Sequence, residues 1–562
     1  MIIYFNTMNK LLKNKFYLYA TEFFSGMSVM AVELGASRLL APYFSSSQIV
    51  WTIIIGTIMI AMALGNIYGG KAADKNPDPG KLYGRIIIAS IWIALIPVLG
   101  KYIILGISGL LIVTVSNVFL IIAAFIACMV IFVFPLFLLG TVTPSLARFT
   151  MDSVDESGKI VGTLGAYNTV GSIIGTFLPT FVTIPSVGTS VTFLIFSGVL
   201  LILGGLYFVS ALTDSKKGND PSDRSGETYE KKEIKKGIIK LIVGVIIFII
   251  ALIIGAKDSF AFWEDNLLYE GESVYNYLQV KDTDESVILS TNVLFGVQSI
   301  MMKEDELTGM YYDYAMAAPL MADVVNKRDT PKMLVLGMGT GTYARQCSKY
   351  YPGMISKGVE IDDDIIKLSR KYFDLPEEIE VVSYDGRAFL NADKEKYDVI
   401  MVDAYQDITI PFQMSSVEFF RLVADHLNEN GVMVVNMNMQ TDEPDNICDY
   451  LEDTISSVFP NVYTAKVRYN TNCELFASFN SDMMEVYENN LSKMEEGSLK
   501  EFLTGVKDDY LKYEAGNLLL TDDKAPVELL GIQVIDSIIE REVKYYKDVY
   551  KEQGIDGILN SI

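Results

Sequence analysis

The sequence predicts two parts of different kinds, an N-terminal α-helical multi-pass membrane domain and a C-terminal α/β domain built on a parallel sheet. The chain has 562 residues, more than one hydrophobic core usually organises. Half of the residues are hydrophobic, only 20% are charged, and the mean hydropathy is +0.29. Residues 1–256 hold 19 basic and 13 acidic residues, whereas residues 257–562 hold 27 basic and 56 acidic ones. An apolar, mildly basic part therefore precedes an acidic, soluble one.

Seven apolar stretches of the first part approach the twenty residues that a helix needs to cross a bilayer. Glu22, Glu33 and Arg38 lie in the first of them, which excludes a cleavable signal peptide. The apolar run 102–114 is shorter, and we expect it to lie in the interface or to re-enter. The predicted spans are at about 17–40, 49–70, 84–103, 116–140, 160–183, 188–211 and 238–256.

These spans define a membrane domain at 1–212, a charged and flexible linker at 213–237, and a seventh transmembrane helix at 238–257. Lys and Arg gather in alternate short loops, which places the N terminus in the cytoplasm. A crossing at 238–256 then puts the acidic part outside the cytoplasm. The alternative is that this stretch lies in the interface or re-enters, and the sequence leaves both open.

Two carboxylates, Glu22 and Glu33, lie about three helical turns apart on one face of the first span. Such a pair could relay protons or a cation. Alternatively, Glu22 reaches the interface and Glu33 pairs with Arg38. Close helix packing is predicted by glycines at four-residue spacing, Gly65 with Gly69 and Gly171 with Gly175.

In the second part, residues 258–330 are expected to form a small β-rich region, and 331–562 a Rossmann-like domain in which short apolar strands alternate with helices. A strand at 333–337 enters the turn Gly337-Met338-Gly339-Thr340-Gly341, and the next strand ends on Glu360. Glycines let a ligand approach the backbone, and an acid about twenty residues further on can accept hydrogen bonds from ribose hydroxyls.

Two further strand ends carry polar groups, Asp385-Gly386 and Asp403. In open α/β sheets the carboxyl ends of the strands converge on one crevice. Because no phosphate-loop Lys follows the glycines, an adenosyl ligand fits better than a nucleoside triphosphate. A helix at 415–427, a strand at 431–438 and an antiparallel pair at 461–469 and 473–479 complete a pattern that resembles S-adenosylmethionine-dependent methyltransferases.

Several classes of site are excluded. The four cysteines form no CxxC pair, and the single His426 rules out His-based metal sites and Ser/His/Asp triads. No metal is therefore expected, and carboxylates must do any acid–base work. The acidic second part is a poor partner for nucleic acid but attracts small cationic substrates.

Residues 264–480 resemble the polyamine aminopropyltransferases, or spermidine synthases. The resemblance lies in LYEGESVYNYLQV, VQS at 297–299, GMYYDYAMAAPLM at 309–321, LVLGMGTGTYARQ, GVEIDDDIIKLSRKYF, SYDGRAFL and YDVIMVDAYQ. The first part, with AVELGASRLLAPYFSSSQIVWT, GNIYGGKAAD and GAYNTVGSIIGTFLP, is similar to a membrane module fused to such domains in bacteria. TDDKAPVELL at 521–530 resembles the tail of those fusions.

The resemblance implies a spermidine synthase fold and transfer of an aminopropyl group from decarboxylated S-adenosylmethionine, a co-substrate rather than a tightly bound cofactor, to putrescine or a related amine. It implies that Asp403 accepts the proton. The implied donor-binding residues are Gln298, Gly337, Gly339, Thr340, Gly341, Glu360, Asp385 and Gly386, and the implied substrate-binding residues are Tyr311, Asp313, Tyr405 and Asp407. It also implies a homodimer, and a multi-pass protein of the cell membrane.

Two positions depart from the family pattern. Thr340 stands where the family has an Asp that holds the donor's ammonium, and a hydroxyl cannot replace that charge-assisted hydrogen bond. The family's DSSDP reads Asp403-Ala404-Tyr405-Gln406-Asp407, so its second acid is lost at Gln406 or displaced to Asp407. Methyl transfer from intact S-adenosylmethionine, and a non-catalytic nucleoside sensor on a membrane transporter, therefore stand as alternatives.

Overall fold

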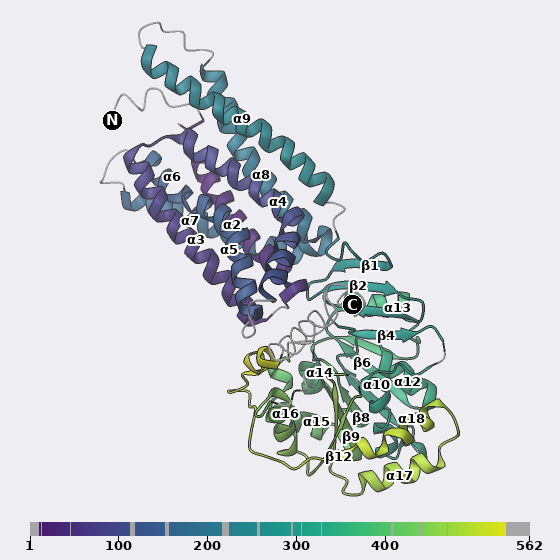
Figure 1. Ribbon diagram of the computed structural model, residues 1–562. Coiled ribbons are helices and arrows are strands. Elements are labelled where there is room, and N and C mark those ends of the chain that lie inside the picture. Colours follow the sequence, from purple (N-terminus) through teal and green to yellow (C-terminus); the bar gives the residue numbers. More distant parts are fainter. Residues whose placement is uncertain are drawn as a thin grey trace, which may run out of the picture. The chain divides into compact units, whose positions relative to one another are not determined.

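The chain divides into two compact units (Figure 1). The helical unit comprises residues 1–111 and 121–262, and the α/β unit comprises residues 112–120 and 263–562. The computed structural model describes residues 11–534 except 13, 45–46, 113–118, 152–156, 216–223, 256–258, 294–295, 305, 328, 406–409, 439–440, 442 and 469.

The helical unit consists of long apolar helices. Within its described residues, six helical stretches are long and apolar enough to cross a membrane. One of them, Ser157–Thr213, contains both predicted spans 160–183 and 188–211, with a π-helical turn at the end of the first and the non-helical Gly188 at the start of the second. The elements are α2 (Lys15–Phe44), α3 (Gln48–Lys75), α4 (Pro79–Ile112), α5 (Phe119–Gly140), α6 (Val142–Thr150), α7 (Ser157–Leu178), η2 (Pro179–Thr183), α8 (Ile184–Ser215) and α9 (Arg224–Gly255).

Two expectations for this unit were wrong. Residues 102–112 continue α4 and form no separate interfacial piece. The linker was expected to be flexible, but α9 begins at Arg224, so the linker's second half belongs to the same helix as the last predicted span. Its Glu and Lys residues have high helix propensity, and extending an existing helix avoids the cost of nucleating a new one.

Helix α7 packs closely on α2, as the glycine spacing predicts. A Cβ atom at Gly171 would lie 2.0 Å from the carbonyl oxygen of Phe23, and one at Gly175 would lie 2.1 Å from that of Met27. Only glycine permits this approach.

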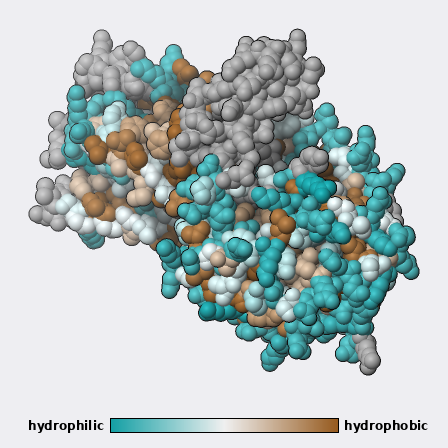
Figure 2. All heavy atoms as spheres, turned by 60° about the horizontal axis from the view of Figure 1, so that its bottom comes forward, coloured by the Kyte–Doolittle hydropathy of each residue, from teal (hydrophilic) through white to brown (hydrophobic). Residues whose placement is uncertain are grey.

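Large apolar side chains of α9 are exposed, among them Ile253. In the face shown in Figure 2, hydrophobic side chains gather over the helices, whereas hydrophilic ones cover most of the α/β unit.

The α/β unit begins with a small antiparallel sheet in the order β1-β2-β3-β4. Its apolar face packs on helix α13 (Asp363–Tyr372), where Leu278 and Leu289 meet Ile365 and Leu368. The strands are β1 (Leu267–Glu272), β2 (Tyr277–Asp282), β3 (Ser286–Ser290) and β4 (Ser299–Met302).

The large sheet has the strand order β12-β10-β11-β9-β8-β5-β6-β7. Strands β5 to β9 are parallel, and β11 is antiparallel to both β9 and β10. This confirms the Rossmann-like prediction, including its closing antiparallel pair. Because β5 lies between β6 and β8, the chain reverses its winding there, and ligands bind at such switch points. The strands are β5 (Lys332–Leu336), β6 (Ile355–Glu360), β7 (Glu380–Ser383), β8 (Tyr397–Val402), β9 (Leu427–Met437), β10 (Asn461–Lys466), β11 (Cys473–Ser478) and β12 (Leu511–Lys512).

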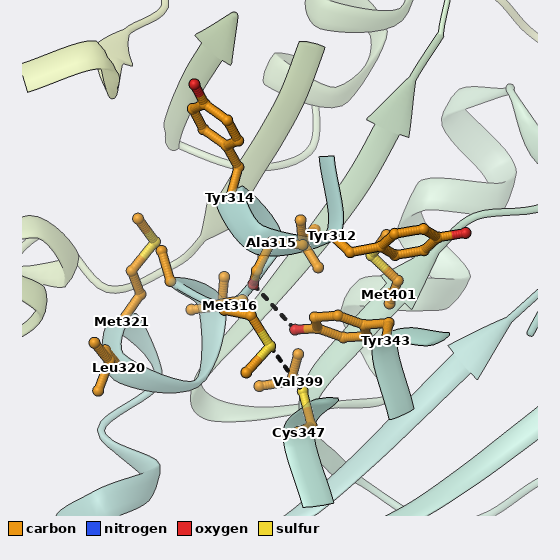
Figure 3. Close-up of a cluster of buried hydrophobic side chains, with 14 of the residues drawn as sticks. Tyr312, Tyr314, Ala315, Met316, Leu320, Met321, Tyr343, Cys347, Val399 and Met401 are labelled. Carbon is orange, nitrogen blue, oxygen red and sulfur yellow. Dashed lines mark hydrogen bonds between the residues drawn. The ribbon is translucent and has the colours of Figure 1, made fainter. Parts of the chain in front are cut away.

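Helices cover both faces of this sheet (Figure 1). One face carries α10 (Tyr311–Ala315), α11 (Ala318–Met321), α12 (Thr342–Tyr350), α17 (Met483–Lys493) and α18 (Ser498–Val506). The other carries α14 (Gly386–Ala392), α15 (Val417–Asp425) and α16 (Ile447–Ser456). In the core of the first face, the Tyr343 hydroxyl donates to the carbonyl oxygen of Ala315 at 3.1 Å (Figure 3).

Strand β8 shows how this arrangement positions the site. Val399 and Met401 lie in the core between the sheet and helices α10–α12, which we call the α10–α12 core. Ile400 and Val402 lie in the core on the opposite face of the sheet. Side chains alternate along a strand, so Asp403, the next residue, continues the face of Met401.

Candidate active site

The glycine turn after β5 lies against the end of β8. The backbone N–H of Asp403 donates to the carbonyl oxygen of Leu336 at 2.9 Å. Gly337 has φ of 78°, and a Cβ atom there would lie 2.5 Å from the Cα of Ala404. A side chain at this position would separate the two strand ends, so glycine is required. Gly339 and Gly341 also have positive φ.

Asp403 is the central group of the site. Its Oδ2 accepts a hydrogen bond from the Tyr311 hydroxyl at 2.8 Å, and its Oδ1 accepts one from Asn436 Nδ2 at 2.9 Å. Burial raises the pKa of Asp403 to about 7, with a smaller contribution from the negative charge of Glu360, although both hydrogen bonds oppose the rise. A carboxylate with a pKa near neutrality can take up and release a proton at physiological pH.

Two asparagines that sequence reasoning missed hold Asp403 in place. Asn436, near the end of β9, accepts a hydrogen bond from Asn472 Nδ2 at 2.7 Å while it donates to Asp403. Both side chains are buried. The signal was the apolar run of β9 ending in two asparagines, because Asn436 shares the face of Val432 and Val434.

Glu360 lies at the end of β6, beside the glycine turn. Its Oε2 accepts from the backbone N–H of Gly339 at 2.9 Å, and its Oε1 from that of Asp362 at 3.0 Å. Burial raises the pKa of Glu360. Each oxygen has a further lone pair, so this carboxylate can also accept hydrogen bonds from a vicinal diol.

Thr340 lies in the same turn. Its backbone N–H donates to Ser299 Oγ at 3.1 Å. Its hydroxyl is buried and has no hydrogen-bond partner in the part of the chain that the structure describes. An unsatisfied buried hydroxyl in a binding turn is available to a ligand.

The remaining predicted donor-binding residues surround these groups less directly. Gln298 accepts a hydrogen bond from the Tyr312 hydroxyl at 3.1 Å through its backbone carbonyl. Asp385 caps α14, because its Oδ1 accepts from the backbone N–H of Ala388 at 2.8 Å, and Gly386 is the first residue of that helix. The cap leaves one carboxylate oxygen of Asp385 for a ligand.

The polar atoms of two predicted substrate-binding residues already form hydrogen bonds within the protein. The Asp313 carboxylate is fully buried and accepts from the backbone N–H groups of Thr308 and Gly309, the Thr308 hydroxyl and Gln346 Nε2, at 2.7–3.1 Å. The Tyr405 hydroxyl donates to the carbonyl oxygen of Met414 at 2.9 Å. Asp407 lies outside the described residues.

The tail motif at 521–530 contacts helices α14 and α15. The two Asp522 oxygens accept from Arg387 Nη1 and Nη2, each at 2.7 Å, and Oδ1 also accepts from Ser416 Oγ at 2.6 Å. This contact ties the tail to the first residues of α14 and to the N-cap of α15. Sequence reasoning noted the motif without this role.

The described residues contain no group of three His, Cys, Asp or Glu side chains that could hold a metal ion. All four cysteines are buried, and none of them forms a disulfide within the described residues.

The spermine/spermidine synthase domain profile matches residues 310–490. The probable polyamine aminopropyl transferase of Bifidobacterium longum is 49% identical over 346 residues, covering 58% of this chain and 76% of the relative. The polyamine aminopropyltransferase of Vibrio vulnificus is 23% identical over 232 residues, covering 40% and 76%. The crystal structure of a probable spermidine synthase from Corynebacterium glutamicum aligns with 19% identity and a TM-score of 0.33, covering 45% of this chain and 98% of that one.

Proposed function

This chain belongs to the polyamine aminopropyltransferase family, and from that premise we propose that it transfers the aminopropyl group of decarboxylated S-adenosylmethionine to putrescine or a related amine at a membrane. The observation that carries the proposal is the buried Asp403, which has a pKa of about 7 and accepts hydrogen bonds from Tyr311 and Asn436. It is a proton acceptor matched to an amine that must lose a proton as it reacts.

The reaction needs one bond made and one broken. The acceptor nitrogen attacks the carbon beside the sulfonium, the new C–N bond forms, and the C–S bond breaks to release methylthioadenosine. The nitrogen's surplus proton passes to the carboxylate of Asp403. Holding both reactants in line supplies much of the rate.

For the donor we propose that Glu360 binds the ribose hydroxyls. The turn that contains Gly337, Gly339, Thr340 and Gly341 contacts the rest of the nucleoside. Asp385 and Gly386 lie beside the adenine, and Gln298 is nearby. The two occupied oxygens of Glu360 fix its orientation, which supports this role. Tyr311 donates a hydrogen bond to Asp403 and so acts on the substrates through that carboxylate. The hydrogen bonds of Asp313 and Tyr405 within the protein favour a structural role for both.

We also propose a multi-pass protein of the cell membrane, supported by the six long apolar helices. The side on which the α/β unit lies can be determined by labelling. A cysteine introduced at the exposed Lys394 would react with a membrane-impermeant maleimide from one side of sealed vesicles only, and the buried native cysteines give little background. The homodimer stays a prediction.

The test of the reaction is mass spectrometry of products from the full chain in detergent, given putrescine with decarboxylated or with intact S-adenosylmethionine. We expect methylthioadenosine and spermidine from the decarboxylated donor. Asp403→Asn should lower kcat by about 10²-fold or more, and nucleoside binding should persist. S-adenosylhomocysteine from the intact donor would indicate methyl transfer instead, and binding without product would indicate a sensor.

A further inference from the structure

Beside Asp403 lies a second buried carboxyl group that the proposed reaction does not use. Glu474, on β11, is 0% exposed. Neither of its carboxyl oxygens has a hydrogen-bond partner among the described residues. Burying an unpaired ionisable group is costly, so a chain retains one where it serves a purpose.

The sheet register places Glu474 next to the catalytic carboxylate. Strand β11 pairs with β9 so that Glu474 lies opposite Asn436, whose amide donates to Asp403. Directly opposed residues of antiparallel strands have Cβ atoms about 5 Å apart. Asp403, Asn436 and Glu474 therefore form a polar row across three neighbouring strands.

All three side chains lie on one face of the sheet. Glu474 is two residues from Phe476, which packs in the α10–α12 core, and Asp403 and Asn436 continue the same face of their strands. Burial raises the pKa of Glu474 well above its ordinary value, and the nearby Asp403 adds to the rise. An adjacent cation would oppose this rise by favouring the charged carboxylate.

A cation is the ligand that matches this arrangement. Both substrates of the proposed reaction carry ammonium groups, but only one nitrogen reacts at Asp403, so the other positive charge needs its own acceptor. An ammonium offers three donors. Glu474 offers two oxygens, and the side-chain oxygen of Asn438, two residues beyond Asn436, is likewise without a partner among the described residues.

We propose that Glu474 binds a primary alkylammonium group of one of the two substrates, in the same pocket as Asp403. The inference rests on the proposed function and adds the recognition of the charged end. The group belongs either to the donor's aminopropyl arm or to the far end of the diamine acceptor, and the two sources share this chemistry.

The test is Glu474→Gln in the full chain, with each substrate varied separately. Loss of a charge-assisted contact should raise one KM by about 100-fold, with kcat changed only a few-fold. A rise in the donor's KM assigns the group to the aminopropyl arm. A rise in the acceptor's KM, with loss of the preference for putrescine over butylamine, assigns it to the diamine.

The matched control is Glu452→Gln. Glu452 is a partly buried acid on α16, which packs on the opposite face of the sheet. Its replacement should leave both KM values unchanged. Unchanged KM values in Glu474→Gln, or a loss confined to kcat, would overturn the proposal.

Thermal unfolding with each ligand alone separates this inference from the proposed function, because it needs no turnover. The ligand-free Glu474→Gln protein should keep the parent's Tm, because the amide has the size of the carboxyl group and no described hydrogen bond is lost. Putrescine or decarboxylated S-adenosylmethionine should raise its Tm less than the parent's. Equal Tm shifts in both proteins would overturn the role of Glu474, whether or not the parent forms product.

Discussion

Replacing Tyr311 by Phe tests how the site controls the proton affinity of Asp403. The substitution keeps the ring and removes the hydroxyl that donates to Asp403 Oδ2 at 2.8 Å. That hydrogen bond stabilises the carboxylate, so its loss should raise the pKa of Asp403 above its present value of about 7. A hydrogen bond to a charged group is worth about 1.5–3 kcal/mol, and one pKa unit corresponds to about 1.4 kcal/mol. The expected rise is therefore about one to two units.

This rise has a measurable consequence for the rate. At pH 7 the ionised fraction of Asp403 should fall from about one half to between about 1% and 10%, so kcat/KM should fall about 5- to 50-fold. Asp403 acts as a base only when it is ionised, and a higher pH ionises it again. The lost kcat/KM should therefore return as the pH rises past 9. The measurement is kcat/KM for methylthioadenosine formation between about pH 5.5 and 9.5.

Tyr351→Phe is the control, because its buried hydroxyl donates to the carbonyl oxygen of Met316 rather than to Asp403. It should leave the acid limb of the pH profile near 7. A loss of rate in Tyr311→Phe that is equal at every pH, with the limb unmoved, would refute the idea that this hydroxyl tunes Asp403.

Three further substitutions test other parts of the structure. Gly175→Val should lower the Tm of the detergent-solubilised protein, because a side chain there meets the α2 backbone, whereas Gly165→Val on the same helix has nothing within 4 Å and should not; equal Tm losses would contradict the packing. Thr340→Val removes a hydroxyl without a described partner, so the ligand-free Tm should not fall and the donor KM should rise; a lower Tm would show that the hydroxyl already has a structural partner. Arg387→Met breaks the partly exposed pair with Asp522 and should cost about 1 kcal/mol or less in urea unfolding, and a loss above about 3 kcal/mol would mean that the tail holds more of the fold than this contact suggests.

Local pattern sufficed for much of the α/β unit. The strands before the glycine turn and before Asp403 are short, apolar and bounded by turn residues, and such runs identify buried parallel strands without any tertiary information. Placing Glu360 and Asp403 at the same edge of the sheet, on either side of β5, then required only the rule that the carboxyl ends of parallel strands converge. The structure confirms both placements.

The rest depended on partners that a linear pattern does not contain. Asn436 and Glu474 become members of the site only through the register between β9 and β11. Conversely, Asp313 and Tyr405 occupy positions that the resemblance assigns to substrate binding, yet their polar atoms are engaged by Gln346, Met414 and a neighbouring loop. Resemblance identifies positions, whereas hydrogen-bond partners decide what each side chain is free to do.

The antiparallel course of β11 makes the site sensitive to the length of the connection that precedes this strand. Residues 467–472 join β10 to β11 and set which residue of β11 faces which core. Because side chains alternate, an insertion that slipped β11 by one residue would turn Glu474 into the apolar core of the opposite face and bring Cys473 toward Asp403. Inserting one residue in this hairpin would thus replace a carboxyl group by a thiol beside the catalytic carboxylate, although Asp403 lies more than sixty residues earlier in the sequence.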